Sequence, residues 1–574
     1  MRIVILGGGP GGYEAALVAA DHGVDVTVVS EEGLGGNTVL WDCVPSKALV
    51  VSSEARDWVG RAREHGVRWT GRTEIDASAH VDLGAVMDRI AALAGDQSAD
   101  IGKKVERAGV RIVEGRGRLT GPRSLAVAHP DGTTSELTAD VILLSTGSRP
   151  RLLDYAVPDG ERVFTSRELF SLRELPRRLI VVGSGATGAE YASAFARFGC
   201  EVHLVSSRQQ ILPSEDPDAA AVIEDAFERR GMTIHRGCRA VDAARDADGV
   251  RVKVWQRSDD AEWWLEGSHV LWCVGQVPES EGLGLAEAGV EVADDGTIPV
   301  DGVSRTNIPT IYAAGDVTGG IMLASVAAMQ GRNAMWHALG DAVAPLRTET
   351  ISACVFTDPE VATVGMTAAQ AEHAQVPVRT ETLPLSGNPR AKMADITDGF
   401  VKVLAMRGSG TVLGGSVVAA RASDLIHPLS VAVQNRLTVS QVAHAFSIYP
   451  SLSGSVQETA RLLMSPDAPR PAPNAQRPRA SQKRGGVSAP ATPEAVANRS
   501  PRGEGSPHDH ARIRKRSRLC ESQSRADSRR RTNVRHGWGR SKPPDWRRGK
   551  RSCTATPRSS TGWTPSSRTS WTCP

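Results

Sequence analysis

The sequence predicts an α/β protein with two Rossmann-like nucleotide-binding domains, followed by a disordered basic tail. A short apolar strand leads into a Gly-x-Gly-x-x-Gly turn and a helix at Gly7, and the same pattern recurs at Gly183. In Rossmann-like folds this strand, turn and helix together bind a pyrophosphate. After Met464 the chain is rich in Arg, Ser, Pro and Thr without periodicity, which predicts disorder over residues 466–574.

The 574 residues divide into an acidic body and a basic tail. Residues 466–574 carry 25 Lys and Arg against 7 Asp and Glu, a net charge of +18, whereas residues 1–465 carry 43 against 58, or −15. Because nucleic acid needs a basic footprint, we expect no specific nucleic-acid partner for the acidic body. The sequence has neither an apolar run of eighteen residues nor a signal-peptide pattern, which predicts a cytoplasmic protein without a membrane span.

The eight cysteines are scattered, five of them in the body and three in the tail. None is paired with another at the spacing of metal ligands or of a redox Cys-x-x-Cys motif. This distribution indicates reduced thiols and no metal site.

The first glycine motif follows the apolar strand Arg2–Leu6 and precedes an Ala-rich helix expected over Tyr13–His22. Gly7 allows the turn, Gly9 lets a pyrophosphate approach the backbone, and Gly12 lets the helix and the strand pack closely. The helix N-terminus then offers unpaired N–H groups to the phosphates.

The second glycine motif has the same parts in the same order. The strand Arg178–Val182 leads into Gly183, Gly185 and Gly188, and a helix follows. A pair of such motifs is far more specific than a single one, and it implies that the protein binds two nucleotides.

The strand after each motif should end at the residue that contacts a ribose. After the strand Asp25–Val29 the nearest acid in place is Glu31, which we assign to the adenosine ribose. After the strand Glu201–Val205 the chain runs Ser206-Ser207-Arg208, with no acid to repel a 2′-phosphate and with a cation nearby. We therefore predict that Arg208 lets the protein accept NADPH as well as NADH, while a preference for NADH stays open.

The segment Gly35–Lys47 reads Gly-Gly-Asn-Thr-Val-Leu-Trp-Asp-Cys-Val-Pro-Ser-Lys. It resembles the redox-active segment of the flavoprotein disulfide reductases, the family of lipoamide dehydrogenase, glutathione reductase and mercuric reductase. In most of that family two cysteines of this segment form a disulfide beside a flavin. Here the second cysteine is Cys43, but the first position is Thr38, so an intramolecular disulfide is not available.

Other segments extend the resemblance over residues 1–465. It implies an FAD site and an NAD(P) site, and it implies that Lys47 and Glu190 form an ion pair beside the flavin. The further residues that it implies to bind the cofactors are Gly36, Gly117, Thr146, Gly147, Asp316, Ala324 and Gly275.

The resemblance also implies the domain organisation. Residues 1–150 and 276–345 should form the FAD-binding domain, and residues 151–275 the NAD(P)-binding domain. Residues 346–465 resemble the α+β dimerisation domain of the family, whose marker stands here as Phe356–Gly365. We therefore expect a homodimer.

The end of the dimerisation domain departs from the family pattern. In the disulfide reductases a histidine and a glutamate here serve the thiols as an acid–base pair. This chain has Tyr449 and Gly454 in their places, and His444 matches neither position, so we interpret it as an ordinary helix residue. The disulfide and its acid–base pair are thus missing together, and Cys43 becomes a remnant beside the flavin.

Hydride transfer from NAD(P)H to a flavin needs positioned nucleotides and not a disulfide. The electrons must then pass directly to an acceptor, and a planar quinone that takes two electrons fits this need. The pattern resembles the NAD(P)H:quinone reductase branch of the lipoamide dehydrogenase-like proteins. Our leading hypothesis is an FAD-dependent NAD(P)H:quinone oxidoreductase, with Tyr449 as a further candidate active-site residue.

Three alternatives stay open. A soluble pyridine nucleotide transhydrogenase also retains one cysteine, although it retains the first cysteine and the glutamate. A peroxidase could use Cys43 as a sulfenic acid. A catalytically silent flavoprotein would bind its cofactors without turnover.

Overall fold

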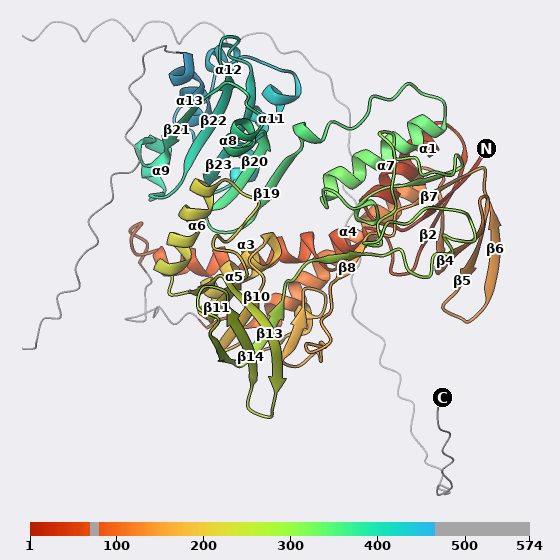
Figure 1. Ribbon diagram of the computed structural model, residues 1–574, viewed down its shortest axis with the longest axis horizontal. Coiled ribbons are helices and arrows are strands. Elements are labelled where there is room, and N and C mark those ends of the chain that lie inside the picture. The colour runs from red at the N-terminus through yellow and green to blue at the C-terminus, as the bar shows by residue number, and fades with distance from the viewer. Residues whose placement is uncertain (69–79, 465–574) are drawn as a thin grey trace, which may run out of the picture. The chain divides into compact units, whose positions relative to one another are not determined.

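The structure is a computed structural model that describes residues 1–68 and 80–464 (Figure 1). The predicted disordered tail, residues 466–574, lies outside the described residues, as do residues 69–79. The described chain is a mixed α/β structure, as the sequence predicts.

The first sheet is parallel, with the strand order β18-β7-β1-β2-β3. Its strands are β1 (Arg2–Leu6), β2 (Asp25–Ser30), β3 (Arg111–Glu114), β7 (Val141–Leu144) and β18 (Ile311–Ala313). Almost every side chain of β1, β2 and β7 is buried, which is typical of a parallel sheet that is covered on both faces. The two predicted strands Arg2–Leu6 and Asp25–Val29 are confirmed, the second with one residue more.

Helices α1 (Pro10–Asp21) and α7 (Ala324–Ala338) pack against each other beside this sheet (Figure 1). The helix predicted over Tyr13–His22 therefore begins three residues earlier. Proline is favoured in the first turn of a helix because its missing N–H would have no partner there. The early start places the helix N-terminus directly after Gly9.

The second sheet repeats the plan of the first. It is parallel with the order β12-β11-β10-β16-β9, so β10 is flanked by β11 and β16 as β1 is flanked by β2 and β7. Its elements are β9 (Val163–Thr165), β10 (Arg178–Val182), β11 (Glu201–Ser206), β12 (Thr233–Arg236) and β16 (His269–Trp272), with helices α5 (Ala186–Phe198) and α6 (Pro217–Arg229). In both sheets a glycine loop leaves the central strand at its carboxyl end, where open α/β sheets bind ligands.

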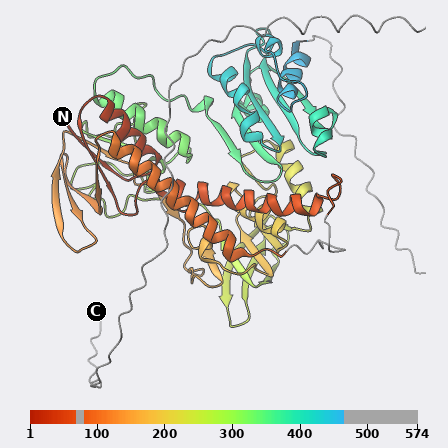
Figure 2. The same ribbon diagram turned by 180° about the vertical axis from the view of Figure 1, so that it is seen from behind.

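Smaller sheets and helices complete these two regions. Three-stranded antiparallel sheets are formed by β4 (Arg116–Gly121), β5 (Ser124–Ala128) and β6 (Thr134–Thr138), and by β13 (Cys238–Arg245), β14 (Val250–Gln256) and β15 (Glu262–Gly267). Strands β8 (Ser148–Pro150) and β17 (Gln276–Pro278) pair with each other. Helix α2 (Gly36–Leu40) is followed by the long helices α3 (Cys43–Arg61) and α4 (Leu83–Arg107), which contact each other (Figure 2).

The third large sheet is antiparallel, with the order β19-β20-β23-β22-β21. Its strands are β19 (Ser352–Val355), β20 (Glu360–Gly365), β21 (Val378–Pro384), β22 (Phe400–Met406) and β23 (Val412–Ala419). The helices of this region are α8 (Ala368–His373), α9 (Pro389–Met393), α10 (Ala422–Leu425), α11 (His427–Gln434), α12 (Val439–His444) and α13 (Gly454–Met464).

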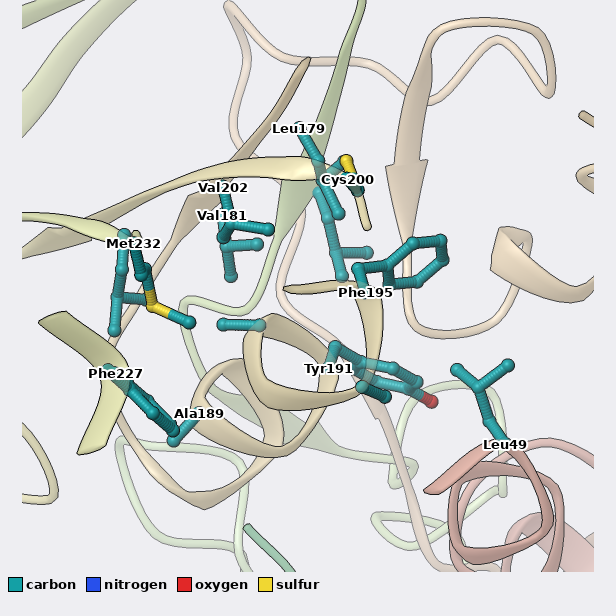
Figure 3. Close-up of a cluster of buried hydrophobic side chains, with 14 of the residues drawn as sticks. Leu49, Leu179, Val181, Ala189, Tyr191, Phe195, Cys200, Val202, Phe227 and Met232 are labelled. Atoms are coloured by element: carbon teal, nitrogen blue, oxygen red, sulfur yellow. The ribbon is translucent and has the colours of Figure 1, made fainter. Parts of the chain in front are cut away.

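One hydrophobic cluster joins helix α3 to the second sheet. Leu49 of α3 packs with Tyr191 and Phe195 of α5, and all three side chains are buried (Figure 3). Leu49 follows Lys47 by two residues, and Tyr191 directly follows Glu190. The cluster therefore packs helix α3, which carries Lys47, against helix α5, which carries Glu190.

Candidate active site

The first glycine loop has a backbone that only glycine can form. Gly7 has φ of +106°, and a Cβ there would overlap the carbonyl group of Ser145. A Cβ on Gly12 would overlap the carbonyl oxygen of Gly7, and a Cβ on Gly36 would come within 2.8 Å of the Cα atom of Gly9. The loop leaves no room for side chains and exposes its backbone at the start of α1, which suits a pyrophosphate.

A cavity extends from this loop along the carboxyl ends of the first sheet. The cavity is lined by nine of the predicted cofactor-binding residues, namely Gly7, Gly9, Glu31, Gly36, Gly117, Thr146, Gly147, Asp316 and Ala324. Gly12 lies beneath the loop instead, where it lets α1 approach β1. Residues Thr38, Trp41, Asp42 and Cys43 line the same cavity.

The loop after β7 and the loop after β18 are tied together at this cavity. The Ser148 hydroxyl donates a hydrogen bond of 2.7 Å to the Asp316 carboxylate, and the Asn37 amide donates to the carbonyl oxygen of Ser148. The Thr146 hydroxyl donates to the carbonyl oxygen of Glu279 over 2.7 Å. Burial raises the pKa of Asp316, although the Ser148 hydrogen bond opposes the rise.

Two neighbouring acids follow β2, and their contacts differ. The Trp41 indole donates to Glu32 over 2.7 Å, and the Arg167 guanidinium pairs with the same carboxylate while lying over the Trp41 ring. Glu31 is exposed, lines the cavity and has no hydrogen bond or ion pair to a described residue. Of the two acids, Glu31 is therefore the one whose carboxylate is available to a ribose.

Gly117 lies on β4, where it faces the strand that carries the first glycine loop. A Cβ at this position would collide with the side chain of Leu6, so the absence of a side chain lets β4 approach β1. The close approach places the Arg116 and Gly117 backbone on the cavity wall.

The second glycine loop has nearly the same geometry as the first. Gly183 has φ of +111°, and its Cβ would overlap the carbonyl group of Cys273. A Cβ on Gly188 would overlap the carbonyl oxygen of Gly183, as on Gly12 it would overlap that of Gly7. Gly185 and Gly9 cap their helices with the same φ of −71°. The backbone of the second loop therefore suits a pyrophosphate as the backbone of the first does.

The loop after β11 holds the residues that were predicted to select the nicotinamide cofactor. The buried Ser206 hydroxyl lies 2.8 Å from the Ser184 hydroxyl of the glycine loop and donates to the carbonyl oxygen of Arg208. The Arg208 side chain is exposed and makes no ion pair with a described residue. Gly275, with φ of +107°, ends the turn after β16.

The predicted ion pair between Lys47 and Glu190 is present. The Nζ atom of Lys47 lies 2.7 Å from a carboxylate oxygen of Glu190, and the other oxygen accepts a hydrogen bond of 2.9 Å from the Phe356 amide. The Lys47 ammonium also lies 4.9 Å from the centre of the Phe356 ring. Burial is the largest single effect and lowers the pKa of Lys47, but the attraction and hydrogen bond of Glu190, together with Cys43 and Asp42, outweigh it, so the pKa of Lys47 is raised.

Cys43 begins helix α3 and is a free thiol in the described chain. Burial raises its pKa to about 11, and the neighbouring Asp42 carboxylate adds to the rise. The thiol is therefore protonated at neutral pH, where a reactive cysteine needs to be a thiolate.

Sequence reasoning missed Asp42, which precedes Cys43 at the N-cap of α3. Its side chain does not cap the helix and forms no hydrogen bond with a described residue. Burial raises the pKa of Asp42, Glu190 and Asp316 raise it further, and Lys47 opposes them. An acid at this position is visible in the sequence, but only the fold shows that it is enclosed and unpaired.

Tyr449 is not brought to this cavity within the chain. Its side chain is 81% exposed, as is that of Ile448, in the segment between α12 and α13. Gly454 begins α13, and His444 ends α12 with a hydrogen bond to the backbone of its own helix. His444 is thus a helix residue, as the sequence indicates.

The described residues contain neither a cluster of metal ligands nor a helix that could span a membrane. Across residues 1–68 and 80–464, no three His, Cys, Asp or Glu side chains are grouped so that they could hold a metal ion. Within the same residues, no helix has the length and apolar character to cross a membrane.

Comparison with protein families gives two matches. The family model described as pyridine nucleotide-disulphide oxidoreductase matches residues 1–331. The model for the dimerisation domain of the same family matches residues 351–460.

Several known proteins are similar over most of this chain. A Mycobacterium tuberculosis protein named NAD(P)H dehydrogenase (quinone) is 46% identical over 81% of this chain and 94% of its own length. A dihydrolipoyl dehydrogenase of Chlorobaculum tepidum is 34% identical over 80% of this chain and 96% of its own. The crystal structure of LpdA from Mycobacterium tuberculosis superposes with a TM-score of 0.76, at 46% identity, over 81% of this chain and all of that one.

Proposed function

This chain belongs to the pyridine nucleotide-disulphide oxidoreductase family, and we propose that it is an FAD-dependent NAD(P)H:quinone oxidoreductase that works without a dithiol relay. The family is one of flavoprotein oxidoreductases that use FAD and NAD(P)H. The proposal concerns the acceptor, which is where this chain departs from the dihydrolipoyl dehydrogenases that it resembles.

The proposal rests on the contrast between a missing cysteine and a complete ion pair at the same site. Cys43 and Thr38 both line the cavity, and Thr38 stands where most of the family has the other cysteine of the disulfide. Cys43 is itself protonated, with a pKa raised to about 11 by burial. The Lys47–Glu190 ion pair is nevertheless complete beside it. The site thus retains what positions a hydride transfer and lacks what a dithiol exchange needs.

The predicted cofactor-binding residues lie at two nucleotide sites, one for each cofactor. Gly7, Gly9, Gly36 and Asp316 would hold FAD in the first cavity, with Glu31 on its adenosine ribose. A bound flavin would supply the chemistry of accepting a hydride from NAD(P)H and of passing two electrons to a quinone.

Gly183, Gly185, Gly188 and Gly275 would hold the nicotinamide cofactor, with Arg208 beside the 2′-position of its ribose. Lys47 and Glu190 would orient the facing parts of the two cofactors. Their ion pair links α3, next to the first site, with α5, which begins at the second.

Tyr449 and the homodimer are further parts of the proposal. The family's dimerisation domain covers residues 351–460, and Tyr449 lies in its exposed segment between α12 and α13. We expect a second copy of the chain to cover this segment. A cytoplasmic location stays a prediction of the sequence, which cell fractionation would test.

The other activities predict different substrates. The raised pKa of Cys43 argues against a peroxidase, because a peroxidatic cysteine must react as a thiolate. A transhydrogenase would exchange hydride between NADPH and an NAD analogue without any quinone. A silent flavoprotein would not be bleached by NAD(P)H.

A steady-state comparison of acceptors tests the proposal. The FAD-loaded protein is assayed with NADH or NADPH against a small benzoquinone, a small naphthoquinone, lipoamide and glutathione disulfide. We expect turnover with the quinones and none with either disulfide. Turnover with lipoamide or glutathione disulfide but not with a quinone would overturn the proposal.

A further inference from the structure

We propose that Asp42 is the proton donor for quinone reduction, because it is the enclosed, unpaired carboxyl of the cavity wall beside Cys43 and the Lys47–Glu190 ion pair. The inference deepens the proposed function and rests on it. It concerns a step that a disulfide substrate and a quinone do not share, namely the protonation of an oxygen atom of the acceptor.

The contacts of the other carboxyls on the cavity wall set Asp42 apart. Glu32 is paired with Arg167, while Glu279 and Glu281 are paired with Arg149. Each of these three side chains is therefore already bound to a guanidinium group.

The two remaining carboxyls of the wall also differ from Asp42. Asp316 accepts a hydrogen bond from Ser148, and Glu31 is exposed to solvent. Asp42 is partly buried and makes no side-chain hydrogen bond to a described residue. It is thus the carboxyl of the described cavity wall that is both enclosed and without a partner.

The backbone holds Asp42 in place even though its side chain is free. The Asp42 amide donates to the carbonyl oxygen of Asn37 over 2.7 Å, and the Asp42 carbonyl accepts from the Ser46 amide over 2.8 Å. The residue is therefore fixed between α2 and α3 while its carboxyl faces the cavity. A carboxyl that is positioned by its backbone and makes no capping hydrogen bond with its helix is suited to give and take a proton.

The charged and titratable groups around Asp42 come from several elements. Lys47 on its own helix favours the carboxylate, but the Lys47 ammonium is already bound to Glu190 of α5. Glu190 and Asp316 both disfavour a further negative charge. Burial acts in the same direction and is the largest effect, so the pKa of Asp42 is raised.

Two other titratable groups, Tyr191 and Cys273, are influenced by the charge of Asp42, but neither is a proton donor at neutral pH. Burial raises the pKa of Tyr191 on α5 and of Cys273 after β16, and the Asp42 carboxylate adds to the rise of both. Neither group would release a proton near neutral pH, and neither would Cys43, whose pKa is raised to about 11. Asp42 is the acid of this group that can donate.

The proposed step balances in protons and electrons. A quinone that has received a hydride, two electrons and one proton, is a hydroquinone monoanion. The Asp42 O–H bond then breaks, a new O–H bond forms on the anionic oxygen, and no electron moves in this step. The Asp42 carboxylate afterwards takes a proton from water, so that NAD(P)H, a proton and the quinone are consumed in equal amounts.

The variant Asp42→Asn tests proton donation separately from cofactor binding. An amide has nearly the same shape as a carboxyl group but cannot donate an acidic proton. We expect the rate of quinone reduction at neutral pH to fall by about 100-fold, the low end of the usual contribution of a general acid. Reduction of ferricyanide, which takes electrons and no proton, should stay within about twofold of the unaltered enzyme. Asp96→Asn, the same change at an exposed position on α4, is the matched control and should leave both rates unchanged.

A spectroscopic measurement reads the protonation of Asp42 without turnover. The infrared spectrum of the FAD-loaded enzyme at neutral pH should contain the carbonyl stretch of a protonated carboxylic acid. The band should shift in D2O and be missing in the Asp42→Asn variant. If that variant does not retain FAD, Asp42→Glu supplies the test, since its quinone rate should keep a pH dependence with a displaced midpoint.

The results of these experiments distinguish a failure of the proposed quinone reductase activity from a failure of the proposed role of Asp42. An unaltered enzyme that reduces ferricyanide but no quinone refutes the proposed function and this inference together. An enzyme that reduces quinones, but whose quinone rate is insensitive to Asp42→Asn, refutes the inference alone. So does the lack of an Asp42-dependent carboxylic acid band, or a loss of ferricyanide reduction that matches the loss of quinone reduction.

Discussion

The Nζ atom of Lys47 lies 2.7 Å from a carboxylate oxygen of Glu190, although the two residues are 143 positions apart in the chain. Lys47 is on α3 beside the first glycine loop, and Glu190 is on α5, the helix that starts at the second. The pair therefore joins the two nucleotide sites. Leu49, two residues after Lys47, and Tyr191, directly after Glu190, pack in one buried cluster that joins the two helices (Figure 3).

Glu190→Gln should slow the reduction of the bound flavin by NAD(P)H. An amide oxygen can still accept from the Phe356 amide, but the ion pair with Lys47 is lost and leaves the ammonium largely uncompensated. A hydrogen bond between charged groups contributes about 1.5–3 kcal/mol, so we expect a loss of about 10- to 100-fold. Stopped-flow absorbance measures the rate. An unchanged rate would mean that the pair is only structural, and Glu372→Gln at an exposed position of α8 is the control.

Gly12→Ala and Gly188→Ala form a matched pair of variants. Each added Cβ would overlap a carbonyl oxygen at the same place in its own glycine loop. Such overpacking costs about 1–3 kcal/mol locally, so Gly12→Ala should lower the content of bound FAD. Gly188→Ala should retain FAD but weaken NAD(P)H binding. The ratio of FAD to protein and a titration with NAD(P)H distinguish them. Equal loss of FAD in both variants would contradict separate sites.

Arg208→Ala tests the choice of nicotinamide cofactor. The exposed Arg208 side chain has no ion-pair partner in the described chain and is free to meet a 2′-phosphate. Removing one hydrogen bond to a charged group costs about 1.5–3 kcal/mol, so KM for NADPH should rise by about 10- to 100-fold. KM for NADH should stay the same and serves as the internal control. A parallel rise for both cofactors would show that Arg208 does not read the 2′-phosphate.

Alkylation of Cys43 should depend steeply on alkaline pH. The thiol has a pKa raised to about 11 by burial, and only the thiolate reacts. Its rate of carbamidomethylation, followed by mass spectrometry of the peptide that contains Cys43, should rise about tenfold per pH unit up to about pH 11. A midpoint near the value of a free thiol would contradict the enclosed, protonated state. The variant Cys43→Ser should still reduce quinones, since the proposed reaction does not use the thiol.

Much of this architecture follows from local sequence. The two glycine motifs fix φ and close packing within six residues, so Gly7, Gly12, Gly183 and Gly188 could be assigned directly. The strand before each motif is apolar throughout, which is the pattern of a parallel sheet with both faces covered. The start of α1 was misplaced because Pro10 was assigned to the loop, whereas proline suits the first turn of a helix.

The rest depends on contacts between distant segments. The Phe356 amide, which donates a hydrogen bond to Glu190, is 166 residues away from it in the chain. No short sequence motif predicts a backbone donor of this kind. The sequence assigns the adenosine ribose to Glu31, but only the fold shows that the neighbouring Glu32 is bound by Trp41 and Arg167. Asp42 was not predicted from the sequence, because its burial and the lack of a side-chain hydrogen bond depend on the fold.

Reoxidation of the loaded enzyme under anaerobic conditions tests the central claim most directly. The protein with bound FAD is first titrated with one equivalent of NADPH and then mixed in a stopped-flow instrument with a small naphthoquinone or with lipoamide. The recovery of flavin absorbance is followed in each case. Recovery with the quinone at a rate at least equal to turnover, and none with lipoamide, is the result that we predict. Recovery with lipoamide but not with the quinone would contradict a path of electrons that bypasses a dithiol.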